Sequence, residues 1–200
     1  MQVVNLRLIP RQRNEIIGNV QINLTEEYTL VRTMNEPITI RGYQDGDREY
    51  CRSLWRELVE WHREIYADPS IGGEHPEDYF DKHLAKVGAG NIWVASRGTN
   101  LVGFVGLIIE ENEGEIEPLI VTQSLRHEGI GKQLVRKVIF EVRKRGLPSI
   151  SVRPVARNEK ALGFFFMQGF NVLGRLELFM DFSGHAWKSG VKIHECEFEF

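Results

Sequence analysis

The spacing of hydrophobic and polar residues changes along the chain, and these changes predict where helices and strands fall. Residues 38–40 alternate as in a short strand, and apolar residues then recur at three- and four-residue intervals as far as Tyr66. Asp45 or Asp47 is placed to cap the resulting long helix. Pro76 opens a second, shorter helix. The pattern therefore predicts a strand followed by a pair of helices.

Three apolar runs come next, at residues 92–96, 101–109 and 115–121, and short polar turns join them. Strands joined by such short turns pair antiparallel, so we expect a three-stranded meander. After Gly131 the apolar residues fall on one face of a basic helix, which Gly146 ends. The middle of the chain thus predicts a sheet followed by an amphipathic helix.

The pattern beyond that helix predicts a short strand at 150–152, a helix at 158–168 and two closing strands at 170–173 and 176–182. Helices and strands are mixed along the whole chain, so the predicted fold class is α/β, in the α+β sense.

The two ends of the chain stand apart from this pattern. Residues 1–36 predict an accessory arm or hairpin, and residues 184–200 predict an accessory strand in which Cys196, Phe198 and Phe200 alternate with glutamates. We expect one domain over 37–183, with these two segments added to it. The apolar stripe of the last segment is a candidate homodimer contact or a cover for a sheet edge.

Composition and charge narrow the class of protein. A chain of 200 residues with 42% hydrophobic and 26% charged residues predicts one soluble globular domain. The net charge of -3 argues against a nucleic-acid partner, and no apolar run is long enough to span a membrane. Cys51 and Cys196 are too few for a disulfide framework, which suits the cytoplasm. The six histidines form no metal-binding pattern, so no metal is expected.

The turn from Arg126 to Lys132 carries the clearest chemistry. It joins an apolar strand to the start of a helix, where several backbone N–H groups lack partners and attract anions. A Walker A loop is excluded, because Arg126 stands in place of its first glycine and Gln133 in place of its hydroxyl residue. A Rossmann fingerprint would need glycine at Leu134. The site therefore suits a phosphate of some other kind.

Two motifs in order resemble the GNAT superfamily of acetyl-CoA-dependent N-acetyltransferases. They are Arg-x-x-Gly-x-Gly, from Arg126, and Asn-x-x-Ala-x-x-Phe-Phe-x-x-x-Gly-Phe, from Asn158, and the resemblance covers residues 38–182. It implies a mixed, mostly antiparallel central sheet with helices on both faces. It also implies acetyl-CoA as co-substrate and direct acetyl transfer to a primary amine of a small molecule or peptide.

The resemblance further implies which residues hold the cofactor. The glycine turn would wrap the pyrophosphate, and Leu119 and Val121 would offer main-chain groups to the pantetheine arm. Asn158 would lie near the pantetheine or the sulfur, although asparagine is also an ordinary helix cap. The full set of expected cofactor contacts is Leu119, Ile120, Val121, Arg126, His127, Glu128, Gly129, Ile130, Gly131, Lys132, Asn158 and Phe165.

The chemistry needs a base, because a lysine-like amine with a pKa near 10.4 is only about one part in 10³ neutral at pH 7. Glu115 and Glu117 lie two apart in a predicted strand, so alternation places them on one face with Leu119 and Val121. Either can accept the proton, with Glu115 preferred; the alternative is that both are solvated residues of a charged turn. Where many relatives carry an acidic tyrosine this chain has Phe165, so the departing thiolate needs another acid, a water or none.

The two N-terminal helices are expected to cover the acceptor. Their segment is rich in carboxylates with few cations to offset them, namely Glu57, Glu60, Glu64, Asp68, Glu74, Glu77, Asp78 and Asp81. Glu64, Tyr66 and Tyr79 are the candidate substrate contacts, and the charge favours a cationic amine of the aminoglycoside, polyamine or lysine type. A merely solvated acidic face is the alternative. At the level of function, the competing hypothesis is a non-catalytic acyl-CoA sensor or interaction module on the same fold.

Overall fold

The structure is a computed structural model that describes residues 36–182, 184 and 186–200. The chain divides into two compact units, Met1–Glu36 and Pro37–Phe200, and the account below concerns the second. The accessory arm predicted over residues 1–36 lies outside the described residues, apart from Glu36.

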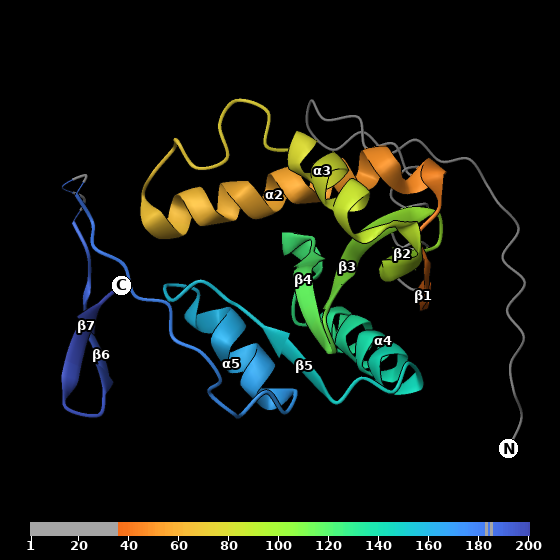
Figure 1. Cartoon of the computed structure of the whole chain (residues 1–200). Helices are drawn as coiled ribbons and strands as arrows, with labels where there is room; N and C mark the ends of the chain where they lie inside the picture. The colour runs from red at the N-terminus through yellow and green to blue at the C-terminus, as the bar shows by residue number, and fades with distance from the viewer. Residues whose placement is uncertain (1–35, 183, 185) are drawn as a thin grey trace, which may run out of the picture. The chain divides into compact units, whose positions relative to one another are not determined.

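A mixed sheet forms the centre of the described unit (Figure 1). Its strands follow one another in chain order, with neighbouring pairs antiparallel until the last pair, which is parallel. This confirms the predicted mixed, mostly antiparallel sheet. The strands are β1 (Ile38–Gly42), β2 (Ile92–Arg97), β3 (Asn100–Glu110), β4 (Glu113–Val121) and β5 (Ser149–Val152).

Helices cover both faces of this sheet, because strand residues alternate between two apolar clusters. Ile92 and Val94 of β2 pack under the first two helices, whereas Trp93 and Ala95 pack under the last two. The first pair is α2 (Arg48–Tyr66) and α3 (Asp78–Val87), and the second pair is α4 (Ile130–Lys144) and α5 (Glu159–Met167). Short 3-10 turns stand at Asp45–Asp47 (η1), Ala89–Asn91 (η2) and Gln123–Leu125 (η3).

Helix α2 begins and ends where the pattern predicted, but the expected cap works differently. Asp47 is the N-cap residue and makes no side-chain capping bond. Its carboxylate instead accepts two hydrogen bonds from the Arg41 guanidinium, at 2.6 and 2.7 Å. This ion pair ties the start of α2 to β1, and it holds the pKa of the Asp47 carboxyl below its usual range.

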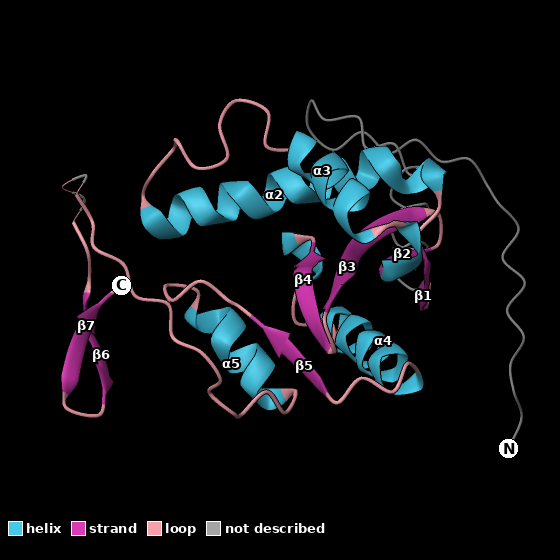
Figure 2. Cartoon of the chain, in the orientation of Figure 1, coloured by secondary structure: helices cyan, strands magenta, loops and turns pink. Residues whose placement is uncertain are grey.

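The predicted closing strands at 170–173 and 176–182 are wrong. Residues 170–182 form neither helix nor strand, and the central sheet ends at β5 (Figure 2). The apolar side chains that produced the prediction are exposed, Val172 to 88% and Phe182 to 91%. Alternation gives a segment the preference for a strand, but a strand forms only with a partner, and the described residues give this segment none.

The C-terminal segment holds two strands where the pattern predicted one. Strands β6 (Ser189–Ile193) and β7 (Cys196–Glu199) pair antiparallel as a separate hairpin. His194 takes a left-handed conformation, with φ of 53°, in the turn between them. The polar residues His194 and Glu195 form this turn. The alternation of the residues that follow was interpreted as one continuous strand, so the turn was missed.

A β-bulge in β4 changes which residues share a face. Val105 of β3 pairs with Leu119 and Leu107 pairs with Ile116, so β4 carries one residue more than β3 at this point. Ile116 and Leu119 therefore face the α4 side together. Glu115 pairs with Ile108 and faces α2 and α3, as Ile120 does. The expectation that Glu115 shares a face with Leu119 and Val121 is wrong, because the bulge inverts the alternation.

Candidate active site

The glycine turn joins β4 to α4 as the pattern predicted. Gly129 is the N-cap of α4, with φ of 79°, and the first helical main-chain bond runs from Gln133 N–H to the Gly129 carbonyl at 3.1 Å. The four N–H groups before Gln133 are therefore not used within the helix. They lie at the positive end of the helix dipole, which is a favourable place for an anion.

The two glycines of the turn serve different purposes. Gly129 has open space around it, so its left-handed backbone is what requires glycine. A Cβ at Gly131 would lie 3.3 Å from the Phe164 ring, so this glycine lets α4 pack closely against α5. Only the first glycine shapes the turn itself.

Two cations lie over one aromatic ring beside this turn. The Arg126 guanidinium and the Lys160 ammonium each lie 5.2 Å from the centre of the Trp61 ring. Neither forms an ion pair with any described residue. Nothing in the sequence links Trp61 to Arg126 or Lys160, because only the fold brings α2, α5 and the turn together.

Glu128 has a structural partner, although it lies in the turn. It forms an ion pair with Arg97 of β2, whose side chain is 10% exposed. The pair fixes the turn to the sheet and offsets a nearly buried charge. His127 and Lys132 are exposed, whereas the Ile130 side chain belongs to the apolar core.

The outer side of β4 is open beyond Ile116. Strand β5 pairs with β4 only from Glu113 to Ile116, and Figure 1 shows the two strands diverging. Thr122 N–H donates to Val102 of β3, so the backbone groups of Val121 point away from β3. By the same alternation, Leu119 points outward as well. The Val121 carbonyl accepts a bond from Arg126 Nε at 3.1 Å, which leaves its N–H for another partner.

Ile120 differs from its two neighbours. Its side chain is 2% exposed and lies in the cluster under α2 and α3, and its carbonyl faces Gly103 of β3. Ile120 therefore holds the strand in place, and the groups directed outward belong to Leu119 and Val121.

Asn158 and Phe165 both belong to α5. The Asn158 side-chain oxygen accepts a bond from Ala161 N–H at 3.1 Å, so Asn158 caps the helix and only its amide nitrogen remains to reach a ligand. Phe165 is 7% exposed and packs edge-on against Phe164 and Phe170. A buried phenyl ring offers packing and no proton.

Glu115 is the buried member of the carboxylate pair. Its Oε2 lies 3.0 Å from Arg153 Nη2, and the side chain is 10% exposed. Burial raises the pKa of this carboxyl above its usual range; the Arg153 charge opposes that effect and the Glu117 charge adds to it. Glu117 itself stands in the bulge and is exposed. The two carboxylates thus have different environments despite their spacing.

The acidic surface expected around the acceptor is largely neutralised. Arginines of α2 bind the carboxylates, in the pairs Arg48–Asp81 (2.8 Å), Arg52–Asp78 (2.6 Å), Arg56–Glu77 (2.7 Å) and Arg63–Glu60 (2.7 Å). Glu57 accepts a bond from the Thr122 hydroxyl at 2.9 Å. The expectation that few cations offset these acids is wrong, because helical spacing places Arg48, Arg52 and Arg56 opposite the start of α3, and Arg63 binds Glu60 within α2.

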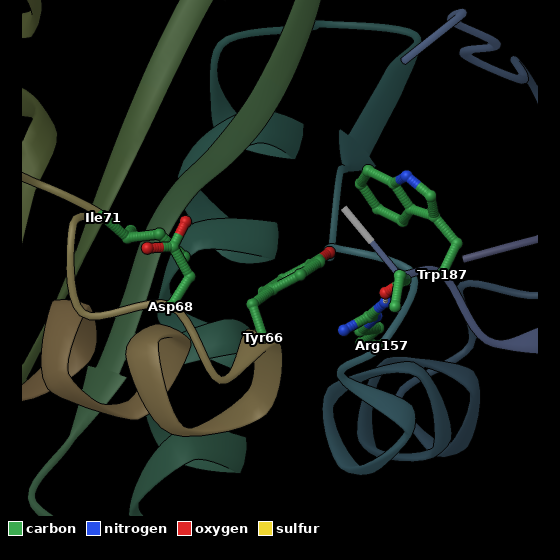
Figure 3. Close-up of a pocket in the computed structure, with 6 residues that line it drawn as sticks. Tyr66, Asp68, Ile71, Arg157 and Trp187 are labelled. Carbon is green, nitrogen blue, oxygen red and sulfur yellow. Dashed lines mark hydrogen bonds between the residues drawn. The ribbon is translucent and has the colours of Figure 1, made fainter. Parts of the chain in front are cut away.

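The three candidate substrate residues separate in the structure. Tyr66 lines a cavity at the end of α2 (Figure 3). Tyr79 is 44% exposed on α3 and lies under the Lys82 ammonium, and Glu64 is exposed on α2. Of the three, Tyr66 alone lines that cavity.

Comparison with known proteins assigns this arrangement to a family. The family model described as Acetyltransferase (GNAT) family matches residues 55–170. The chain belongs to the GNAT acetyltransferase family. The match contains the bulged strand, the glycine turn and α5, so the predicted resemblance is confirmed. A search of curated proteins gave no match.

Solved structures share the fold at low identity. PaiA N-acetyltransferase from Thermoplasma acidophilum, in complex with coenzyme A, is 21% identical over 66% of this chain and 88% of that one, with a TM-score of 0.57. A transcriptional regulator from Bacillus halodurans C-125 is 23% identical over 73% and 100%, with a TM-score of 0.57. AAC(6')-Iy, in complex with a bisubstrate analogue of coenzyme A and acetylneamine, is 17% identical over 72% and 98%, with a TM-score of 0.54.

Two further searches concern the described residues only. The described residues contain no group of three or more His, Cys, Asp or Glu side chains that could hold a metal ion. None of their helices is long and apolar enough to cross a membrane.

Proposed function

We propose that this GNAT acetyltransferase moves the acetyl group of acetyl-CoA directly to a primary amine of a small molecule or peptide. The observation that carries the proposal is the glycine turn at the open edge of β4. Its unused amides, two cations without an ion pair among the described residues and the outward groups of Leu119 and Val121 lie along one path.

Coenzyme A fits this path by its chemistry. A pyrophosphate suits the free N–H groups at the start of α4, with Arg126 and Lys160 to balance its charge. The amide groups of a pantetheine arm suit an unpaired strand edge, where Leu119 and Val121 direct their backbone outward. Asn158 caps the start of α5, the helix that follows β5, and its amide nitrogen is the group left to reach the cofactor.

When bound, acetyl-CoA supplies an activated thioester. Glu115 accepts the proton of the attacking amine, directly or through a water, and its raised pKa brings it closer to that of the amine. Glu117 is the second candidate, since it lies in the bulge next to the open edge. Phe165 donates no proton, and the leaving thiol needs little help because its pKa is near 8.5. Holding the two reactants together provides much of the rate.

Binding is tested by titrating coenzyme A in a calorimeter. We expect binding to the unchanged protein and a loss of about tenfold or more in affinity for the R126Q/K160Q variant, since two charge-assisted contacts are removed. Lys144→Gln is the control, because Lys144 is a cation in the last turn of α4, at the opposite end of that helix from the glycine turn. Equal affinities in all three proteins would remove the phosphate site from the proposal, and absence of binding would end it.

The alternative is a sensor that binds acyl-CoA without catalysis, and the buried Phe165 is the observation that favours it. Turnover decides between the two. Release of free thiol from acetyl-CoA in the presence of a broad amine panel supports the enzyme. Tight binding with no release above the amine-free rate supports the sensor.

We also propose a cytoplasmic location. Both cysteines are free, Cys51 buried and Cys196 exposed, which suits a reducing compartment. The low net charge likewise supports a small-molecule or peptide partner over a nucleic acid.

A further inference from the structure

The segment between β4 and α4 joins the two halves of the proposed cofactor path. The strand half is the open edge at Leu119 and Val121, and the phosphate half is the glycine turn that starts α4. The short turn η3 (Gln123–Leu125) lies between them in the chain. A ligand that contacts both halves at once needs a fixed distance between them. Whatever holds this segment in place therefore affects how well such a ligand fits.

Glu57 of α2 holds the start of the segment. Its Oε2 accepts a hydrogen bond from the Thr122 hydroxyl at 2.9 Å, and its Oε1 accepts a bond from Gln123 N–H. Thr122 is the N-cap residue of η3, yet its own side chain makes no capping bond. The Glu57 carboxylate performs this function from another element, because it binds the first N–H group of η3.

The charge of Glu57 is directed at this segment. Glu60, on the same helix, forms an ion pair with Arg63, whereas Glu57 has no ion pair among the described residues. Its side chain is half-buried. A carboxylate that accepts bonds from a hydroxyl and a main-chain N–H forms stronger bonds than a neutral acceptor would. Glu57 therefore restrains Thr122 and Gln123 firmly.

The same helix also contacts the end of the segment. Trp61 follows Glu57 by four residues, so the two side chains lie on one face of α2, about 6 Å apart along its axis. The Arg126 guanidinium lies over the Trp61 ring, 5.2 Å from its centre. Arg126 Nε donates to the Val121 carbonyl at 3.1 Å. One turn of α2 thus contacts both the start of the segment, at residues 122–123, and its end.

We propose that Glu57 is a positioning residue, which sets the spacing between the strand half and the phosphate half of the cofactor site. It acts through Thr122 and Gln123 and needs no contact of its own with the cofactor. The inference rests on the proposed function, because the spacing matters only if one ligand occupies both halves. Coenzyme A is such a ligand, since its pantetheine arm and its pyrophosphate are covalently joined. Once one half is bound, the gain from the second depends on the distance between them.

Calorimetry with coenzyme A tests this in variants of Glu57. Glu57→Ala removes both bonds, and we expect the affinity to fall by about tenfold. Glu57→Gln should stay within about threefold of the unchanged protein, because its amide can accept from Gln123 N–H and donate to the Thr122 hydroxyl. Glu60→Ala is the matched control on the same helix. Unchanged affinity in Glu57→Ala would overturn the inference.

A fragment of the cofactor separates spacing from a local effect on the turn. Adenosine 3'-phosphate 5'-diphosphate carries the pyrophosphate of coenzyme A and lacks the pantetheine arm, so it cannot reach the strand half. We expect it to bind equally to the unchanged protein and to Glu57→Ala. If Glu57→Ala weakens the fragment as much as coenzyme A, Glu57 only shapes the glycine turn, and the inference fails. It also fails if the fragment does not bind to the unchanged protein, because the phosphate half is then no independent contact.

A second variant keeps the test decisive if Glu57→Ala does not fold. Thr122→Val removes one of the two donors and leaves the bond from Gln123 N–H. We expect it to lower the affinity for coenzyme A by about threefold and to leave that for the fragment unchanged. Equal affinity for coenzyme A in Thr122→Val and in the unchanged protein would then overturn the inference.

The proposed function and this inference fail in different ways. If the unchanged protein does not bind coenzyme A, the proposed function is lost. If it binds coenzyme A and Glu57→Ala binds equally well, the function stands and only the role of Glu57 is excluded.

Discussion

Glu115 combines burial with an ion pair to Arg153, and this combination sets its chemistry. A buried carboxylate is a stronger base than an exposed one, because burial disfavours its charged form. Arg153 limits the effect without cancelling it. The residue is therefore placed to gain a proton at a higher pH than an ordinary glutamate.

The pH profile of acetyl transfer follows from this shift. The base must be ionised to act, so the rate should fall with decreasing pH at a value above about 4.3, the ordinary pKa of glutamate. Glu115→Gln should lower the rate at the pH values where Glu115 is ionised, and should remove that fall. The measurement is kcat/KM against pH for the unchanged protein, E115Q and E117Q. If only E117Q alters the profile, Glu117 is the base.

Gly129 gives a second prediction at the residue scale. A Cβ added at this position would have no atom within 4 Å, so Gly129→Ala acts only through the backbone. An alanine in the left-handed conformation costs roughly 1–2 kcal/mol. We expect the turn to shift and the affinity for coenzyme A to fall by about tenfold. Gly129→Asn should lose less, because asparagine tolerates this conformation. Calorimetry on both variants checks this, and unchanged binding by Gly129→Ala would show that the turn amides do not hold the ligand.

Helix α3 carries a buried histidine that affects stability. His83 is 5% exposed, packs against Trp55, and its Nε2 has no hydrogen-bond partner among the described residues. Gly106 of β3 makes room for it, since a Cβ there would lie 2.5 Å from Nε2. Burial, with a smaller contribution from Lys86, lowers the pKa of His83 to about 4.

Because the pKa of His83 is lowered in the folded protein, we expect the protein to lose stability in mild acid. The unfolded chain binds the proton near pH 6.5, whereas the folded chain resists it until about pH 4. The free energy of unfolding should therefore fall between those values by on the order of 2 to 3 kcal/mol. Urea unfolding at pH 7.5 and pH 4.5 measures it. His83→Gln should reduce the difference, and an equal fall in both proteins would assign it to other groups.

At the level of elements, the spacing of apolar residues predicted the helices whose apolar positions repeat every three or four residues. Helix α2 and helix α4 follow their apolar spacing, and the glycine turn follows from Gly129 and the strand before it. The bulge between Ile116 and Leu119 was not predictable from alternation, because an extra residue leaves the hydrophobic pattern nearly intact. Its one mark in the sequence is Pro118, since proline within a strand is confined to edges and bulges. The position of Lys160 was not predictable either, since it depends on Trp61, which is distant in sequence.

Among the described residues, the sheet edge at β5 and one apolar segment have no partner. Beyond β5 the sheet has no further strand, and the segment after α5 exposes large apolar side chains. These are Val172, Leu173, Leu176, Leu178, Phe179, Met180 and Phe182, each more than half exposed. An open edge and a strand-like segment on one chain are complementary, so two copies can satisfy each other.

We therefore expect a homodimer in solution. Light scattering should give twice the monomer mass, and the double change Leu178→Asp and Met180→Asp should convert it to monomer, because charge on this segment opposes its burial. Tyr50→Asp is a matched control on α2, since Tyr50 is 53% exposed. A monomeric mass for the unchanged protein would contradict the expectation.

The position of Trp61 has a practical consequence. Two cations that would attract the proposed anion lie near its indole, so an anion bound there would change the electric field at the ring. Indole emission depends on such fields. The protein thus contains its own optical reporter of cofactor occupancy, and binding could be followed in real time without any label.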